Sequence, residues 1–417
     1  MSPARDAPAS FTRSDATLRA AYLDEVLRLL YPRPGTGRRG FVVLPSVRRP
    51  RVLVPAESSR LGALAVRRYA EPKSPWKRLQ RDAAALALWG GVGRIAFRDR
   101  LEVSAGPGDI EHHLRGVLGT DLTVSVHIGP ARADRKPVLQ LLAPDGSTVG
   151  FAKLGPAPLT RRLVLAEAAA LELLGRRGTP GLTVPTVWHA GRWRDAQLLV
   201  HSALPVWRRR TAVAPDRLAA AMRALATTGG VYTQVLRVSP YWSRLRDRLR
   251  AVADHPEGRA LAEPAATLQD RAGDIALDFG CWHGDWSPWN MAVLPDTLLV
   301  WDWERFATGV PLGFDALHFC LQRSLQAGGF GRTVDAGVAV EDCLANARWT
   351  LGPQGVPDVA AAHLTALLYL LDLACRYVED RQANAGARLG VSEKWLLQVL
   401  VRRVSVIGQV PGLGGGR

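Results

Sequence analysis

Three oxygen-bearing side chains that could handle a phosphate group and a metal ion lie within one short stretch of the sequence. Asn290 comes five residues after Asp285, and Asp302 comes twelve residues after Asn290. The apolar runs 291–294 and 298–301 flank a turn of Pro, Asp and Thr, which predicts a tight hairpin. The hairpin would bring Asn290 and Asp302 to the same end of a short sheet, beside Asp285.

These residue types suit phosphoryl transfer. Mg²⁺ binds hard oxygen ligands, usually one or two carboxylates together with phosphates and water. A separate carboxylate must orient the attacking hydroxyl and accept its proton. The spacing assigns this second task to Asp285, and metal binding to Asn290 and Asp302, a division of labour that protein kinases share. The alternative is a buried polar turn that caps a hairpin.

The pattern His-Gly-Asp-x-x-x-x-Asn at 283–290, followed by Asp-Trp-Glu at 302–304, resembles the aminoglycoside phosphotransferase and choline kinase family. The resemblance covers roughly residues 120–380. It implies a bilobal, protein-kinase-like α+β fold with a small antiparallel β lobe and a mainly helical lobe. It also implies ATP or GTP as the phosphoryl donor and Mg as the cofactor.

The same resemblance implies supporting roles for two residues around the catalytic loop. His283 belongs to the loop itself, and Asp315 resembles the family's aspartate that braces this loop through hydrogen bonds. An ordinary acidic residue at the start of a helix is the other interpretation of Asp315.

Lys153 is one of only five lysines among 54 basic residues. Arg and Lys are not interchangeable where a compact ammonium group is needed, so each lysine is informative. Lys153 lies in an expected strand, and Glu167 follows fourteen residues later in an expected helix, 163–174. This order resembles the family's ion pair, in which the lysine contacts the α- and β-phosphates. Glu172 is the alternative partner, and an exposed lysine at a strand end is the alternative interpretation.

An apolar strand at 196–205 runs into a linker. In the family this segment is the hinge, whose backbone groups bind the edge of the adenine ring. The resemblance therefore implicates Ser202, Ala203 and Leu204 in nucleotide binding. Only main-chain atoms take part, so the identity of these side chains gives no independent support.

The order of expected elements divides the chain into three regions. Residues 1–118 form a basic α/β extension of unknown role, outside the family resemblance. Residues 119–205 contain three expected antiparallel strands and form the small lobe. Residues 206–417 form the mainly helical lobe with the catalytic loop, and within them 215–280 are expected to be mostly helical.

The chain carries a net charge of +16, and residues 1–118, with 21 basic and 11 acidic side chains, account for +10 of it. A basic excess can indicate a nucleic acid, a membrane surface or an acidic protein as partner, while a general compositional bias is the alternative. Trp76, with Lys73, Lys77, Arg78 and Arg81, marks either a phosphate-binding patch or a solvated helix face. Nucleic acid is not favoured, because the sequence carries no helix-turn-helix or zinc pattern.

The sequence predicts a cytoplasmic protein. No apolar run approaches eighteen residues, so no membrane span or membrane partner is expected. The first residues lack the apolar core of a signal peptide. The four cysteines, 281, 320, 343 and 375, show no metal-ligand spacing and are expected to be buried thiols.

The function we expect is transfer of the γ-phosphoryl group of ATP to a hydroxyl of a small molecule or peptide. All five polar positions that this activity needs are occupied: Lys153, Glu167, Asp285, Asn290 and Asp302. One alternative is a Ser/Thr kinase for a natural-product precursor peptide, whose acidic leader would suit the basic N-terminal segment. Another is a catalytically silent, pseudokinase-type module that supports a partner enzyme.

Overall fold

The computed structural model describes residues 7–32, 35–69, 75–90, 97–130, 132–327, 336–356, 358–380, 400 and 402–404. The chain forms two compact units. The first comprises residues 1–165 and 186–203, and the second comprises residues 166–185 and 204–417.

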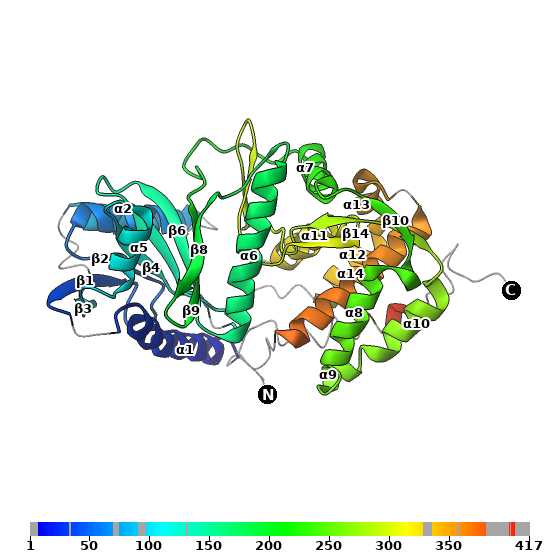
Figure 1. Cartoon of the computed structure of the whole chain (residues 1–417), viewed down its shortest axis with the longest axis horizontal. Coiled ribbons are helices and arrows are strands. Elements are labelled where there is room, and N and C mark those ends of the chain that lie inside the picture. The colour runs from blue at the N-terminus through cyan, green and yellow to red at the C-terminus, as the bar shows by residue number, and fades with distance from the viewer. Residues whose placement is uncertain are drawn as a thin grey trace, which may run out of the picture. The chain divides into compact units, whose positions relative to one another are not determined.

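The first unit is built on an eight-stranded sheet in which every neighbouring pair of strands is antiparallel (Figure 1). The strands follow the order β3-β1-β2-β4-β5-β6-β9-β8 across the sheet. Their bounds are β1 Gly37–Leu44, β2 Val52–Pro55, β3 Arg100–Ala105, β4 Thr123–His127, β5 Val138–Leu142, β6 Thr148–Gly155, β8 Val187–Trp193 and β9 Ala196–Ser202.

Helices cover both faces of this sheet. Successive side chains of a strand point to opposite faces. Phe41 and Val43 of β1 therefore pack in one cluster with helices α1 (Ala7–Leu30) and α5 (Ile110–Leu118). Val42 of the same strand packs in a second cluster with α2 (Ser59–Tyr69) and α3 (Pro75–Trp89). Burial on both faces explains why this strand has a continuous apolar run instead of an alternating pattern.

The first 118 residues share the sheet with the strands that follow them. β2 pairs with β4 through Val52–His127 and Leu53–Val126. The chain passes between the two compact units after residues 165, 185 and 203, so the expected extension 1–118 and the strands that follow it belong to the same unit. A sequence pattern can predict a strand but not which other strand pairs with it. The pairing of β2 with β4 therefore could not be predicted.

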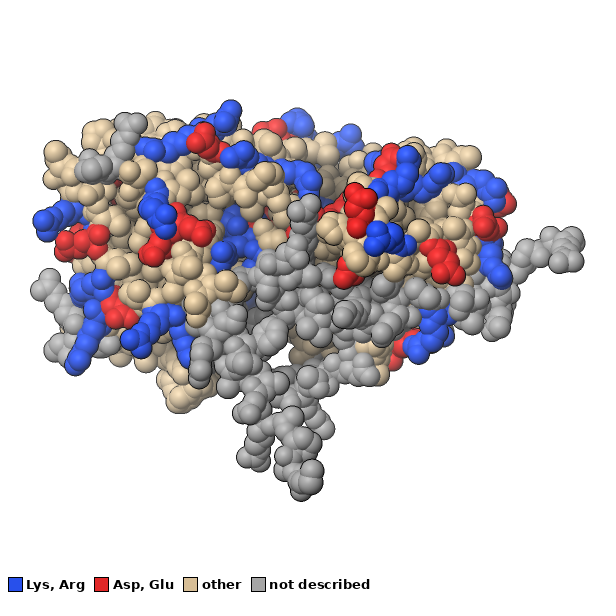
Figure 2. Space-filling model, turned by 90° about the horizontal axis from the view of Figure 1, so that it is seen from below, with Lys and Arg blue, Asp and Glu red and all other residues tan. Residues whose placement is uncertain are grey.

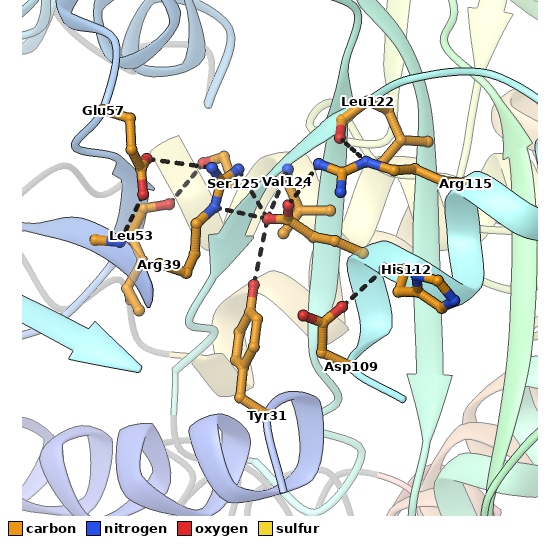
Figure 3. Close-up of polar contacts among 12 residues, drawn as sticks. Tyr31, Arg39, Leu53, Glu57, Asp109, His112, Arg115, Leu122, Val124 and Ser125 are labelled. Atoms are coloured by element: carbon orange, nitrogen blue, oxygen red, sulfur yellow. Dashed lines mark hydrogen bonds and ion pairs between the residues drawn. The ribbon is translucent and has the colours of Figure 1, made fainter. Parts of the chain in front are cut away.

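A buried carboxylate fastens the N-terminal elements to the rest of the first unit (Figure 3). Glu111 is 4% exposed, and its Oε1 accepts hydrogen bonds from Arg39 Nε at 3.0 Å and from Tyr31 Oη at 3.3 Å. Its Oε2 accepts from Arg115 Nη2 at 3.1 Å, and the Val124 amide of β4 lies 3.4 Å from Oε1. Burial raises the pKa of Glu111, and the two arginines oppose that rise.

The second unit is mainly helical and contains two three-stranded sheets (Figure 1). One has the order β10-β11-β14, with bounds Tyr232–Val235, Ala276–Trp282 and Ala307–Pro311. The other has the order β12-β13-β7, with bounds Met291–Val293, Leu298–Val300 and Leu182–Thr183. The antiparallel sheet of the first unit followed by this helical region confirms the expected α+β class.

The helices of the second unit are α7 Pro215–Thr227, α8 Pro240–Ala251, α9 Pro256–Arg259, α10 Ala262–Ala272, α11 Phe314–Ala327, α12 Ala336–Ala345, α13 Ala347–Leu351 and α14 Val359–Glu379, with 3-10 turns η1 Leu236–Val238 and η2 Gly352–Gln354. Helix α6, Pro158–Arg177, begins in the first unit and ends in the second. Most of 215–280 is helical, as expected; β10 and β11 lie outside these helices and pair with each other although α8, α9 and α10 separate them in the chain. The sequence also predicts a helix at 391–407, most of which falls outside the described residues.

Helix α14 is the central core helix of the second unit. By length and hydropathy it could cross a membrane, but 78% of its most apolar 18-residue stretch is buried inside the fold. The helix begins at Asp358, whose side chain accepts a hydrogen bond from the Ala361 amide at 2.7 Å. A core helix packed on all sides is expected to be apolar all round.

Candidate active site

The predicted hairpin is present and sets the geometry of the site. β12 and β13 pair antiparallel, with Met291 opposite Val300. One step beyond this pair, the Trp301 amide donates to the Asn290 carbonyl at 3.1 Å. Asn290 and Asp302 therefore lie at the same end of the hairpin.

Asp285 and Asn290 are in direct contact. The Nδ2 atom of Asn290 donates to Asp285 Oδ2 at 2.9 Å and to the Asp285 main-chain carbonyl at 2.9 Å. Asn290 is buried, whereas the Asp285 side chain is 34% exposed. Because the amide nitrogen of Asn290 is turned toward Asp285, its Oδ1 is the atom that can bind a cation.

A histidine from α11 holds the other oxygen of Asp285. His318 Nε2 lies 2.9 Å from Asp285 Oδ1, and His318 Nδ1 lies 2.9 Å from Tyr369 Oη. Burial lowers the pKa of His318, so the ring is neutral, with Nε2–H donating and Nδ1 accepting from the tyrosine. Burial would raise the pKa of Asp285, but the hydrogen bond from His318 lowers it below its ordinary value.

Sequence reasoning missed His318 and Tyr369. One signal was available, because His318 follows Asp315 by three residues in a helix and such positions share a face. A residue three positions from a loop-bracing aspartate is thus a candidate to reach the same loop. Tyr369 lies on α14, and its contact with His318 joins positions 51 residues apart, so local spacing gave no signal.

Asp315 braces the loop backbone in front of Asp285. Its Oδ2 accepts from the His283 amide at 2.7 Å, and its Oδ1 accepts from the Gly284 amide at 3.2 Å. Burial raises the pKa of Asp315 to about 7, and the two amide donors oppose this rise. Gly284 has φ +84°, and a Cβ there would lie 2.2 Å from the Arg305 carbonyl oxygen, so this turn requires glycine.

His283 links the loop to the strand that precedes Asp302. Its Nδ1 accepts from the Asp285 amide at 3.1 Å, which leaves Nε2–H to donate to the Trp301 carbonyl at 3.1 Å. The ring is fully buried, and burial lowers the pKa of His283 to about 4. A neutral imidazole with one fixed tautomer therefore holds these two segments together.

Asp302 belongs to a cluster of three carboxylates. Oxygens of Glu167, Asp302 and Glu304 all lie within 4.8 Å of one another, and the Trp303 amide lies 3.3 Å from Glu167 Oε1. Such proximity of like charges favours a bound cation, and hard oxygen ligands suit Mg²⁺. Glu304, 7% exposed, was not singled out as a metal ligand from the sequence.

The backbone of Asp302 is itself unusual, with φ +73° in a residue other than glycine. The left-handed region costs an L-residue of order 1 kcal/mol or more and is found at sites where the surrounding structure enforces it. Its occupation by Asp302 shows that the surrounding structure enforces the backbone conformation at this residue.

Arg376 of α14 supports the loop from the interior of the second unit. Its Nη1 donates to the Gly284 carbonyl at 2.6 Å, and its guanidinium lies 5.7 Å from the centre of the Trp282 ring. Arg305, the residue after Glu304 in the sequence, donates a hydrogen bond to the carboxylate of Asp380. Sequence reasoning gave no signal for these contacts, because arginine is abundant throughout the chain.

The remaining candidates are divided between the two units. Lys153 lies on β6, is 8% exposed, and stands in register with Val138 of β5 and Leu199 of β9. Glu167 lies in the part of α6 that belongs to the second unit. The ion pair between Lys153 and Glu167 therefore stays a prediction.

The hinge candidates Ser202, Ala203 and Leu204 lie at the end of β9 and directly after it. Ser202 ends β9 and its amide donates to the Thr186 carbonyl at 2.9 Å, while the Ala203 amide donates to the Val149 carbonyl at 2.8 Å. Leu204 begins the next segment of the second unit, and its carbonyl accepts from the Val206 amide at 2.7 Å. Nucleotide binding by these three residues stays a prediction.

Comparison with known proteins gives similarities to solved kinase structures. Neither a protein-family model nor a curated protein matches this sequence. The chain is similar to aminoglycoside phosphotransferase APH(4)-Ia, solved in a ternary complex with ADP and hygromycin B, at 14% identity and a TM-score of 0.43. The match covers 71% of this chain and 98% of that chain.

Two further solved structures are similar over comparable lengths. Spectinomycin phosphotransferase APH(9)-Ia, in complex with ADP and spectinomycin, matches at 14% identity and a TM-score of 0.40, covering 72% of this chain and 97% of that chain. Choline kinase LicA from Streptococcus pneumoniae matches at 13% identity and a TM-score of 0.42, covering 64% of this chain and 89% of that chain.

Proposed function

We propose that this chain is a phosphotransferase that moves the γ-phosphoryl group of ATP or GTP to a hydroxyl of a small molecule or peptide. The observation that carries the proposal is the fixed, partly exposed carboxylate of Asp285. It is held on one oxygen by His318 and on the other by Asn290, and 34% of the side chain remains exposed. A general base needs this combination of fixed direction and access.

Asp285 acts on the acceptor. Each carboxylate oxygen has two acceptor positions, so each retains one after its hydrogen bond within the protein. An acceptor hydroxyl that donates to Asp285 is oriented for attack, and its proton passes to the carboxylate as the new bond to phosphorus forms. The lowered pKa of Asp285 keeps the carboxylate ionised at neutral pH.

The proposed metal ligands are Asn290 Oδ1 and a carboxylate oxygen of Asp302. The carboxylates of Glu304 and Glu167 lie beside that of Asp302. A bound Mg²⁺ would neutralise charge on the phosphate oxygens of the donor. The hydrogen bond from Asn290 to Asp285 orients the Asn290 side chain, and the left-handed conformation fixes the backbone that carries Asp302. Lys153 is proposed to contact the phosphates of the donor.

Labelled ATP with Mg²⁺ and a panel of hydroxyl compounds and peptides tests this function. Phosphoryl transfer to at least one acceptor is expected, and Asp285→Ala should reduce turnover by about a hundredfold or more. The same variant should still bind nucleotide, because Asp285 is not assigned to metal or phosphate. A near-normal rate in Asp285→Ala would refute the role of this residue.

The catalytically silent alternative makes the opposite prediction for nucleotide. A module that only supports a partner enzyme would show no Mg²⁺-dependent stabilisation by ATP or GTP at millimolar concentration. A nucleic-acid role receives no support from the surface that Figure 2 shows, where Lys and Arg side chains are spread among Asp and Glu side chains. Nucleic-acid surfaces gather their cations on one face or along one helix.

A further inference from the structure

Helix α3 is apolar on two opposite sides, and among the described residues one side is packed and the other is exposed. Its second half, residues 83–89, has the sequence Ala-Ala-Ala-Leu-Ala-Leu-Trp and contains no polar side chain. Ala85 and Leu88 are buried in the cluster that α2 and the sheet form. A helix segment that is apolar all round is normally covered all round.

The exposed side of α3 carries four large apolar side chains. Their exposed fractions are 65% for Trp76, 59% for Leu79, 72% for Leu86 and 55% for Trp89. Scattered exposed apolar residues are ordinary, but a contiguous set on one helix face indicates an interaction site. We call this set, together with Ala83, the outer seam of α3.

The spacing of the outer seam matches a helix–helix interface. Positions 76, 79, 83 and 86 alternate steps of three and four residues, which keeps their side chains on one side of the helix. The small, exposed side chain of Ala83 lies between those of Leu79 and Leu86. Large residues on either side of a small one leave a gap that a side chain of a facing helix can enter.

The charges around the seam are basic. Among the side chains of α2 and α3 that the structure describes, four are basic (Arg60, Arg67, Arg78 and Arg81) and one, Asp82, is acidic, a net charge of +3. Arg60, Arg67 and Arg78 are exposed, and the Arg60 guanidinium lies 5.9 Å from the centre of the Trp89 ring. A second copy of this chain would bring the same positive charge against itself, so the complementary partner is acidic.

We propose that the outer seam of α3 is a docking site for an acidic amphipathic helix of a partner protein. Fifteen residues of α3 span about 22 Å, enough to pair with about two heptads. An anionic membrane fits less well, because a lipid surface gains nothing from the gap at Ala83. It would also approach the carboxylate of Asp82, which lies on α3 and pairs with Arg81 at 2.8 Å. The proposal does not depend on phosphoryl transfer.

A synthetic two-heptad peptide tests the proposal on the full chain. The peptide carries Leu at its seam positions and Glu beside them, and a matched peptide carries Lys in place of Glu. The acidic peptide should bind saturably and should slow amide hydrogen exchange in residues 75–89, whereas the basic peptide should bind at least about tenfold more weakly.

Variants locate the binding. Leu86→Glu places a charge on a side chain that is already 72% exposed, so the fold should persist, and binding of the acidic peptide should weaken by about tenfold or more. Val338→Glu makes a comparable change on α12, at a side chain that is 51% exposed, and should leave binding unchanged. Equal loss in both variants would overturn the proposal.

Three other outcomes would also overturn it. Equal binding of the acidic and basic peptides would remove the argument from charge. Failure of the acidic peptide to bind, together with adsorption to phosphatidylserine vesicles that Leu86→Glu abolishes, would assign the seam to a membrane. A concentration-dependent dimer that Leu86→Glu dissociates would assign the seam to a second copy of this chain.

Discussion

His318 holds the carboxylate of Asp285 from the interior of the fold, with its Nε2 2.9 Å from Asp285 Oδ1. The ring is itself fixed on its other side by the hydroxyl of Tyr369. The proposed base is therefore positioned by a chain of two buried residues on α11 and α14. These residues do not touch the acceptor, so we regard them as positioning residues.

Replacing His318 should move the acid limb of the activity profile to higher pH. Burial would raise the pKa of Asp285, and the hydrogen bond from His318 lowers it instead. In His318→Ala the pKa rises, so the ionised base is lost earlier as the pH falls. The rate on the acid limb should fall roughly tenfold, the equivalent of one hydrogen bond of about 1.4 kcal/mol.

Profiles of kcat/KM against pH measure this effect. Tyr369→Phe removes only the hydroxyl that donates to Nδ1, and it should move the limb in the same direction by a smaller amount. An acid limb that stays in place in His318→Ala would show that the imidazole does not influence the base.

Two substitutions at Asp302 should separate metal binding from stability. Both Asp302→Gly and Asp302→Ala remove the carboxylate, so both should lose the Mg²⁺-dependent increase in melting temperature that nucleotide gives. Glycine accepts the observed φ of +73° without strain, whereas alanine does not. The glycine variant should therefore be more stable than the alanine variant by about 1 kcal/mol.

Thermal melts with and without nucleotide and Mg²⁺ provide both measurements. Retention of the Mg²⁺-dependent shift in either variant would contradict the assignment of Asp302 as a ligand. Equal stability of the two variants would contradict the inferred backbone strain.

His283 should make the protein less stable in mild acid. Burial lowers its pKa from 6.5 to about 4. Between these values the unfolded chain binds a proton that the folded chain does not, so the free energy of unfolding falls as the pH drops through this window. The full difference corresponds to about 3 kcal/mol.

Urea unfolding at pH 6.5 and pH 4.5, compared between the native chain and His283→Gln, isolates this loss, because the raised pKa of Asp315 makes the opposite contribution in both proteins. His283→Gln should reduce the number of protons that the chain takes up on unfolding in this pH window by up to one. His127→Gln provides a matched variant, because burial also lowers the pKa of His127 to about 4, in a strand of the first unit. If His283→Gln keeps the full pH dependence of the native chain, the linkage does not come from this ring.

The sequence predicted those parts of the site that local pattern controls. The hairpin, and the placement of Asn290 and Asp302 at one end of it, followed from apolar runs and a turn. The hydrogen bond between His318 and Asp285 could not be predicted, because it joins residues 33 positions apart and depends on how a helix packs. The approach of Glu167 to Glu304 likewise depends on how α6 meets the loop after β13.

The first 118 residues show the same limit on a larger scale. Their mixed α/β character could be predicted from the sequence, but their place in the sheet could not. Neighbouring strands such as β2 and β4 are far apart in the sequence, and the buried Glu111 contacts residues up to 80 positions away. Only the assembled structure shows that this segment and the strands after it share one core.

Deleting residues 1–118 should therefore unfold the first unit instead of releasing an intact kinase-like chain. The deletion removes Leu23, Phe41 and Ile110 from a shared core in which each is at most 1% exposed, and it leaves β4 without its partner β2. Loss of apolar burial and an unpaired strand edge favour aggregation. Soluble yield, near-ultraviolet circular dichroism and cooperative unfolding of residues 119–417 measure the outcome. A truncated chain that stays soluble, unfolds cooperatively and binds nucleotide with Mg²⁺ would show that the N-terminal segment is a separable domain.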